Sequence, residues 1–172
     1  MRLVMTADTH LPVRAKDLPP ELWAAIDAAD VVVHAGDWVD VSLLDAIERR
    51  TRRVIGVVGD NDGPALAFRL PEVARADLDG LRLAVVHDTG PAAGRERRCA
   101  ARFPDADVLV FGHSHIPWDA VAGTGLRLLN PGSPTDRRRQ PTGTFLTAEV
   151  SAGRLGRVVL HRVATPAQAR MS

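Results

Sequence analysis

Short apolar runs, each ended by residues that bind divalent metals, recur five times along this chain. The runs LVMTAD, VVVHAGD, VIGVVGD, LRLAVVHD and VLVFGHSH are rich in Val, Leu and Ile and stop at Gly, Asp or His. Such runs are typical of buried strands, and open α/β sheets bind ligands at the carboxyl ends of their strands. We therefore expect one site to collect the residues that end these runs: Asp8, His10, Asp37, Asp60, His87, His113 and His115.

Any one of these residues alone has a structural explanation. An Asp that follows a strand is usually a turn former or a helix N-cap, and a lone His is usually structural. The combination is different, because four of the six histidines lie just past predicted strands, at points equivalent to those of three carboxylates. We therefore interpret the set as a single functional site.

The first third of the chain alternates predicted strands with predicted helices. Helices are expected over residues 21–29 and 42–50, where Leu, Ile or Ala recur on one face. The second strand is expected to run to Asp37 and the third through Val58. This order implies a parallel sheet with right-handed crossovers. A later helix is expected over residues 92–102, before the run that ends in GHSH.

Turn signals in the rest of the chain indicate antiparallel hairpins. Asp79-Gly80 joins VARADL to LRLAVV, residues 123–125 separate DAVA from LRLLN, and residues 151–153 separate TFLTAEV from LGRVVLHRV. Together with the parallel segment, these hairpins predict an α/β fold in which two mixed β-sheets pack together and are flanked by helices.

Length and charge limit the classes of function. The chain fits a single domain over residues 1–172, with residues 165–172 as a frayed tail. Its formal net charge is +1, so we expect no strong general nucleic-acid binding. Apolar runs stay shorter than the roughly 18 residues of a membrane span. The single cysteine, Cys99, excludes an internal disulfide and a Cys-rich zinc module, and we expect a cytoplasmic protein that does not bind a membrane.

Spacing indicates how the site residues could share metal ions. Asp8 and His10 are two residues apart, as are His113 and His115, so each pair is expected to leave one face and hold one ion. Two divalent ions about 3.5–4 Å apart need a bridging carboxylate, for which Asp37 is the natural candidate. Mixed imidazole and carboxylate ligands suit Mn, Fe, Ni or Zn better than Ca or Mg. Such ions lower the pKa of bound water from about 15.7 toward about 7, so no Ser or Cys nucleophile is needed.

The order of the motifs resembles that of a known family, the calcineurin-like metallophosphoesterases, and in particular their small single-domain phosphodiesterase branch from bacteria and archaea. The matching blocks are DTH at residues 8–10, HAGD ending at Asp37, GDND at 59–62, VVH ending at His87, GHSH at 112–115 and NPGS at 130–133. The resemblance implies a four-layer αββα sandwich and two divalent ions, with manganese expected. It implies that Asp8, His10, Asp37 and His115 hold the first ion, and that Asp37, Asp60, His87 and His113 hold the second.

The GDND block departs from the family pattern at two positions. Asp60 stands where the family has an Asn ligand, and Asn61 follows it, so either residue could be the ligand. We favour Asp60, because the spacing to Asp62 is then kept. Many monoesterases of the superfamily have a His general acid at the place of Asn61, and an amide cannot act as an acid. We therefore expect a preference for phosphodiesters with good leaving groups, and we expect Asp62 to orient a ligand or the loop.

Some polar residues outside these blocks have open roles. His34 and His161 are interpreted as structural, or for His34 as a support of the site. The NPGS loop could offer backbone N–H groups to a phosphate or simply reverse the chain. The run of Arg137, Arg138 and Arg139 is either a solvated face or a contact for an anionic substrate.

These observations lead to one expected function and one alternative. We expect a phosphodiesterase in which a hydroxide bridged between two divalent ions attacks the phosphorus of a small phosphoester in line, with Asp37, Asp60, His87 and His113 as catalytic residues. The alternative is a metal-binding protein-interaction scaffold without significant hydrolase activity, because a retromer subunit shares this fold. The intact set of seven ligands argues against a pure scaffold. The resemblance also implies association into a homodimer or homotetramer.

Overall fold

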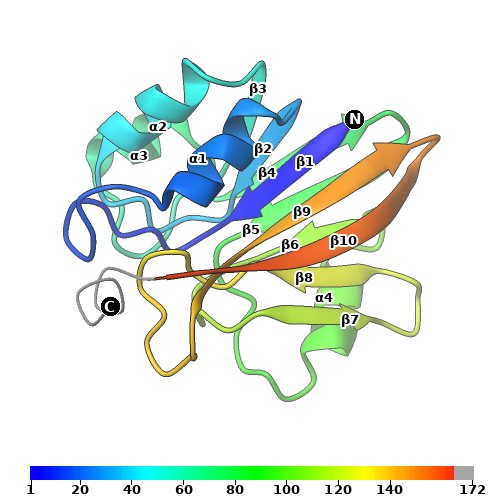
Figure 1. Cartoon of the computed structure of the whole chain (residues 1–172). Coiled ribbons are helices and arrows are strands. Elements are labelled where there is room, and N and C mark those ends of the chain that lie inside the picture. Colours follow the sequence, from blue (N-terminus) through cyan, green and yellow to red (C-terminus); the bar gives the residue numbers. More distant parts are fainter. Residues whose placement is uncertain (165–172) are drawn as a thin grey trace.

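The computed structural model describes residues 1–164, which form two five-stranded sheets (Figure 1). The tail expected over residues 165–172 lies outside the described residues. The first sheet, in the order β10-β9-β1-β2-β3, contains β1 (Arg2–Thr6), β2 (Val31–His34), β3 (Arg53–Gly56), β9 (Gly143–Ser151) and β10 (Arg154–Val163). The second sheet, in the order β4-β5-β6-β8-β7, contains β4 (Val73–Leu78), β5 (Leu81–Val86), β6 (Val108–Val110), β7 (Trp118–Val121) and β8 (Arg127–Asn130).

Both sheets are mixed, as the sequence predicts. β1, β2 and β3 are parallel to one another, and β9 and β10 extend that sheet as an antiparallel hairpin. In the second sheet β5, β6 and β8 are parallel, whereas β4 and β7 pair antiparallel at the two edges. The three predicted hairpins, β4–β5, β7–β8 and β9–β10, are all confirmed.

Helices flank the sheets, although their ends differ from the expected ones. The helices expected over residues 21–29 and 42–50 are α1 (Pro20–Asp27) and α2 (Val41–Glu48). The helix expected over residues 92–102 is α4 (Arg95–Arg102); it begins late because Gly94 takes a left-handed conformation, with φ 70°, just before it. The sequence did not predict α3 (Pro64–Arg69), since six residues are too few to show a helical period.

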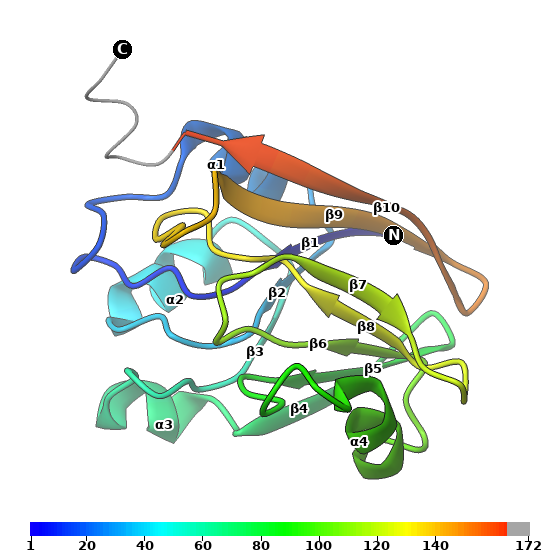
Figure 2. The ribbon, with the colours of Figure 1, turned by 90° about the horizontal axis from the view of Figure 1, so that it is seen from below.

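Alternating side chains create three apolar layers and hence the predicted αββα sandwich. Leu3 and Met5 of β1 point toward the second sheet and join a core between the sheets, whereas Val4 faces the other way, toward α1 and α2. In the same way Leu83 faces the first sheet and Ala84 packs with residues of α4. Figure 2 shows the two sheets stacked, with α1 and α2 outside the first and α4 outside the second.

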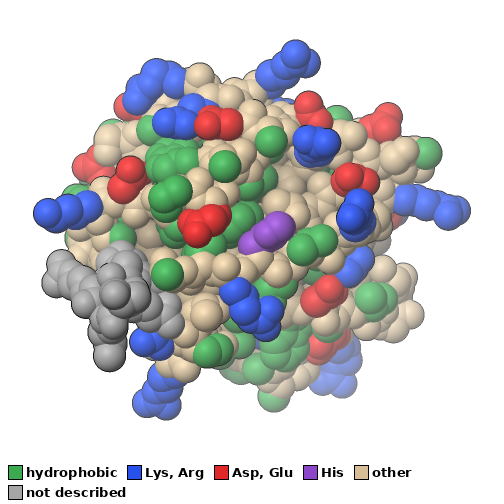
Figure 3. Space-filling model, viewed as in Figure 1, with side chains coloured by type: hydrophobic (Ala, Val, Ile, Leu, Met, Phe, Trp, Pro, Cys, Tyr) green, Lys and Arg blue, Asp and Glu red, His purple; other side chains and the backbone are tan. Residues whose placement is uncertain are grey.

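The surface agrees with the charge balance of the sequence. Basic and acidic side chains are interspersed on the face shown in Figure 3, where no large area carries one sign of charge. Within residues 1–164, every helix is too short or too polar to cross a lipid bilayer.

Candidate metal centre

The predicted site residues meet where the parallel strands of both sheets end. In Figure 2, β1, β6 and β8 all run toward the side on which α2 and α3 lie. The loops that follow these strands bring distant segments together: Asp8 and His10 come after β1, and His115 comes after β6, yet Nε2 of His10 lies 3.3 Å from Nε2 of His115. The sheet edges, and not sequence proximity, therefore build the site.

All seven predicted residues belong to one continuous cluster. Their ligand atoms form three overlapping groups, in each of which the atoms lie within 4.8 Å of one another. Asp8 belongs to two of the groups and His87 to two, so the groups join into one site. The groups are Asp8, His10 and His115; Asp8, Asp37 and His87; and Asp60, His87 and His113.

Asp37 lies at the middle of this cluster. Its Oδ2 atom is 3.4 Å from Nε2 of His10 and also 3.4 Å from Nε2 of His87. Beyond His87, Oδ2 of Asp60 is 3.5 Å from Nε2 of His87 and 2.9 Å from Nδ1 of His113. One carboxylate thus touches both halves of the site, which is the arrangement that a shared ligand requires.

Contrary to the expectation from the sequence, residues two apart in the chain do not project from one strand face. β1 ends at Thr6, β2 at His34 and β3 at Gly56, so all three strands stop before the residues that point into the site. His113 and His115 do not share one ion-sized group: His113 lies with Asp60 and His115 with Asp8. The expectation that each pair leaves one strand face and holds one ion is therefore wrong for His113 and His115.

The physical reason is a left-handed backbone at the site. Five of the seven residues have a positive φ, a conformation that costs a non-glycine residue of the order of 1–3 kcal/mol. Strand alternation does not apply to such residues, and the concentration of strain indicates a functional site. The φ angles are 55° at Asp8, 47° at His10, 60° at Asp37, 71° at His113 and 60° at His115.

Burial and neighbouring charges shift the pKa values of the cluster in opposite directions. Burial raises the pKa of Asp8 to about 8 and lowers that of His115 to about 4. Burial opposes the ionised form of Asp37, but the contact with His87 and the hydrogen bonds from Asn61 outweigh it and lower the pKa of Asp37. Burial also opposes protonation of His87, but Asp37 and Asp8 raise its pKa to about 9. Crowded carboxylates and imidazoles with such shifts are typical of metal and catalytic sites.

The residues of the cluster fit divalent metal ions. Within residues 1–164, Oδ2 of Asp8 and Nε2 of His87 are buried and have no hydrogen-bond partner, a costly state that a metal ion would relieve. The second ring nitrogens of two histidines are held by the backbone: Nδ1 of His87 lies 2.7 Å from the Ala35 carbonyl oxygen, and Nδ1 of His115 lies 2.6 Å from that of Asp136. Such contacts fix the tautomer that presents Nε2 to a metal.

The GDND loop separates the roles of its three polar residues. Asp60 is the residue that reaches His87 and His113, which supports the register favoured from the sequence. Asn61 instead donates to Asp37, from its backbone N–H to Oδ1 and from its side-chain amide to Oδ2, both at 2.9 Å. The side chain of Asn61 therefore holds Asp37 in place.

Asp62 orients the loop, as expected. Its carboxylate accepts three backbone N–H groups, from Gly59 at 2.7 Å, Val39 at 2.7 Å and Asp37 at 3.0 Å. These bonds tie the loop after β2 to the loop after β3, and they stabilise the left-handed conformation of Asp37.

The NPGS loop supports the site through hydrogen bonds that sequence reasoning did not foresee. Ser133 donates its hydroxyl to the carbonyl oxygen of Asp8 at 2.7 Å, and Thr135 donates to that of Thr9 at 2.6 Å. Asn130 donates to the carbonyl oxygen of Gly112 at 3.0 Å. These hydrogen bonds form because Asn130, Ser133 and Thr135 are buried. The sequence shows that the residues are polar but not that they are buried.

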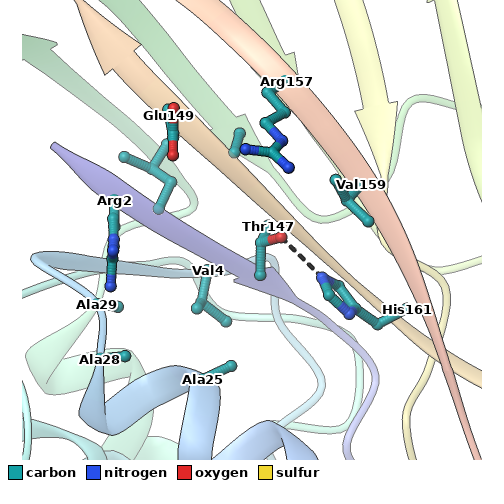
Figure 4. Close-up of a pocket in the computed structure, with 12 residues that line it drawn as sticks. Arg2, Val4, Ala25, Ala28, Ala29, Thr147, Glu149, Arg157, Val159 and His161 are labelled. Atoms are coloured by element: carbon teal, nitrogen blue, oxygen red, sulfur yellow. Dashed lines mark hydrogen bonds between the residues drawn. The ribbon is translucent and has the colours of Figure 1, made fainter.

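The polar residues whose roles the sequence left open lie outside the cluster. His34 is fully buried, stacks on Trp38 and lies 3.0 Å from the Thr9 hydroxyl, as a supporting residue would. His161 lines a separate cavity of about 420 Å³ between α1 and strands β1, β9 and β10, where it hydrogen-bonds Thr147 (Figure 4). Of the arginine run, Arg138 lies near enough to Asp8, His10 and His115 for its charge to act on them.

The fold and the cluster together define a class of protein. A sandwich of two mixed sheets with carboxylates and imidazoles gathered at its strand ends is the architecture of metal-dependent phosphoesterases, and the family model of the calcineurin-like phosphoesterase superfamily domain matches residues 1–153. The chain belongs to the calcineurin-like phosphoesterase superfamily.

Individual relatives support this assignment. A probable metallophosphoesterase of Methanocaldococcus jannaschii is 30% identical over 138 residues, which cover 78% of this chain and 69% of the relative. A second one, from Methanothermobacter thermautotrophicus, is 28% identical over 137 residues, 78% of each chain. The solution structure of a Thermotoga maritima protein is 29% identical, with a TM-score of 0.74, and covers 94% of this chain and 99% of that one.

The fold is also shared with more distant proteins. Vps29 from Entamoeba histolytica, in a crystal structure of its complex with Zn²⁺, is 23% identical with a TM-score of 0.77, and the match covers 95% of this chain and 98% of Vps29. At this identity the likeness bears on the fold alone.

Proposed function

We propose that this chain is a phosphodiesterase that depends on two divalent metal ions. The observation that carries the proposal is the position of Asp37, whose Oδ2 atom lies 3.4 Å from Nε2 of His10 and 3.4 Å from Nε2 of His87. Asp37 would be the shared ligand, with Asp8, His10 and His115 completing one site and Asp60, His87 and His113 the other. The oxygen and nitrogen donors suit manganese, and also Ni, Fe or Zn.

When bound, the ions would supply Lewis acidity and a hydroxide nucleophile at neutral pH. The protein holds the ligands rigidly on the buried side of the cluster, where Asp8, Asp37 and His115 have 5% exposure or less. The other side is open, because the side chains of His113 and Asp60 are 49% and 61% exposed. A phosphoester would therefore approach from the side of Asp60 and His113, while the buried residues would hold the metal ions on the opposite side.

The residue at position 61 decides which esters react. Asn61 keeps its amide on Asp37 and has no proton to give to a leaving group. An alcohol of high pKa would then leave as an unprotonated alkoxide, which is unfavourable, whereas a phenolate leaves readily. We infer that aryl phosphodiesters are better substrates than alkyl monoesters.

The test is a metal reconstitution with paired substrates. The protein is stripped of metal, reloaded separately with Mn²⁺, Ni²⁺, Fe²⁺, Zn²⁺ or Mg²⁺, and assayed with bis(p-nitrophenyl) phosphate and with an alkyl phosphomonoester. We expect hydrolysis of the diester with Mn²⁺, a slower reaction of the monoester, and loss of both in Asp37→Asn. The variant Asp40→Asn serves as the matched control, because it changes a nearby carboxylate that caps α2 and is not part of the cluster.

The scaffold alternative makes the opposite prediction. It requires that no metal form hydrolyse any phosphoester and that Asp37→Asn leave partner binding unchanged. A cytoplasmic location and association into a homodimer or homotetramer are further proposals, which fractionation and light scattering would test.

A further inference from the structure

A cavity of about 480 Å³ opens directly beside the candidate metal centre. Its walls are the loop of residues 88–92 after His87, the segment of residues 112–116 that carries His113, and the side chains of Arg95 and Trp118. The volume lies within the range of about 300–1,000 Å³ that is usual for small-molecule sites. Because His113 belongs both to the cluster and to this wall, a ligand in the cavity would be adjacent to the reacting phosphorus.

Arg95 is the unusual residue of this cavity. It is only 6% exposed, and its guanidinium lies 4.9 Å from the ring centre of Phe111 and 4.6 Å from that of Trp118. Its Nε donates to the Thr89 hydroxyl at 3.0 Å, and its Nη2 donates to the Gly90 carbonyl oxygen at 3.3 Å. These neutral acceptors and aromatic faces hold the side chain in one orientation.

What Arg95 lacks is a counter-charge. Among the described residues, no carboxylate lies within ion-pair distance of it, and its Nη1 atom makes no hydrogen bond. The arginines of the neighbouring second sheet are paired with carboxylates; Arg127, for example, lies 2.8 Å from Asp119. Buried charges in folded proteins are normally paired, because an uncompensated one is costly. The nearby carboxylate of Asp88 accepts the Gly90 N–H at 2.8 Å and faces His113 at 3.9 Å instead.

We propose that this cavity is a subsite for a second anionic group of the substrate, with Arg95 as the residue that binds it. The proposal rests on the proposed phosphoesterase function, and it names the substrate class: phosphoesters that carry a further phosphate or carboxylate on the esterified group. The reacting phosphate lies at the metal centre, and the second anion enters the cavity and pairs with the guanidinium of Arg95.

Two chromogenic substrates that differ only in the second anion test this assignment. They are thymidine 5′-(p-nitrophenyl phosphate) and its 3′-phosphorylated counterpart, used with the Mn²⁺-loaded protein. A charge-assisted contact with Arg95 predicts a KM about tenfold lower for the phosphorylated substrate. In Arg95→Gln this ratio falls to about one, whereas in Arg97→Gln, an exposed residue of the same helix, the ratio is unchanged.

A second variant tests the proposal if Arg95→Gln fails to fold. Ile116 lines the cavity and is 46% exposed, so Ile116→Glu places a carboxylate there at little structural cost. It should raise KM for the phosphorylated substrate alone, relative to Ile116→Gln. Equal KM values for the two substrates in the wild type, or an Arg95→Gln variant that keeps the wild-type ratio, would overturn the proposal.

A binding measurement separates this proposal from the phosphoesterase function. If neither substrate is hydrolysed, calorimetric titration with thymidine 3′,5′-bisphosphate and with thymidine 5′-monophosphate still reports on the subsite. We expect the bisphosphate to bind about tenfold more tightly, and Arg95→Gln to abolish that difference. Equal binding of the two nucleotides would refute the subsite, whatever the activity.

Discussion

The close contact between Gly59 and Asp37 makes a sharp prediction about the centre. A Cβ atom built on Gly59 would lie 2.9 Å from Cγ of Asp37, and closer still to the backbone nitrogen and Oδ1 of Asp37. Ordinary van der Waals contact of such an atom begins at 3.4 Å. Gly59→Ala must therefore push the loops after β2 and β3 apart, which displaces the carboxylate from its contacts with His10 and His87.

The expected magnitude follows from overpacking. Forcing an extra methyl group into a packed site costs about 1–3 kcal/mol. For a chain of 172 residues, at about 2–4 °C per kcal/mol, the melting temperature should fall by about 2–12 °C. Because Asp37 is displaced, Mn²⁺ binding should also weaken about 10–100-fold, as it does when the support of a metal ligand is lost.

The assay combines thermal unfolding followed by circular dichroism with calorimetric Mn²⁺ titration. Gly63→Ala is the matched control, because a Cβ there meets nothing within 4 Å, and we expect a change within about 0.5 kcal/mol. Wild-type Mn²⁺ affinity in Gly59→Ala would refute the central placement of Asp37.

Three further predictions concern neighbouring residues. Asp62→Ala removes the acceptor of three backbone N–H groups and should lower the free energy of unfolding in urea by about 2–4 kcal/mol. Mn²⁺ binding should also weaken; unchanged Mn²⁺ affinity would restrict Asp62 to a structural role. Asp60→Ala should reduce the Mn²⁺ stoichiometry from two to one while Asp60→Asn retains two; two ions in Asp60→Ala would exclude Asp60 as a ligand. Burial lowers the pKa of His34 well below 6.5 in the folded protein. As the pH falls through about 6.5, the His34 imidazole is therefore protonated in the unfolded chain but not in the folded one. The free energy of unfolding then falls by up to about 1.4 kcal/mol per pH unit. In the metal-free protein, unfolding at pH 7.5 and 5.5 should show a steeper loss for the wild type than for His34→Gln; equal slopes would mean that His34 is protonated when folded.

Much of the fold and of the site could be predicted from the sequence because strand ends carry a strong signal. Apolar runs closed by Gly, Asp or His marked the ends of β1, β2, β3, β5 and β6, and parallel strands gather their carboxyl ends on one side of a sheet. The cluster therefore contains every predicted residue, from Asp8 to His115. The hairpins followed from Asp-Gly and Gly-rich turns, whose backbone preferences are local.

Backbone conformation at the site could not be read in the same way. Asp8, Asp37 and His113 are left-handed although nothing in their residue types requires it; the surrounding hydrogen bonds, such as those of Asp62, impose that conformation. The pairing of Arg95 with aromatic rings and not with a carboxylate depends on contacts between α4, β7 and the loop after β5. A run of arginines in the sequence gives no sign of such contacts.

The most direct test of the account is a crystal structure of the protein soaked in Mn²⁺, with the ions located by anomalous scattering. We predict two anomalous peaks about 3.5–4 Å apart, one bound by Asp8, His10 and His115 and the other by Asp60, His87 and His113, with Asp37 contacting both. A single peak, or ions bound without Asp37, would contradict the two-metal centre.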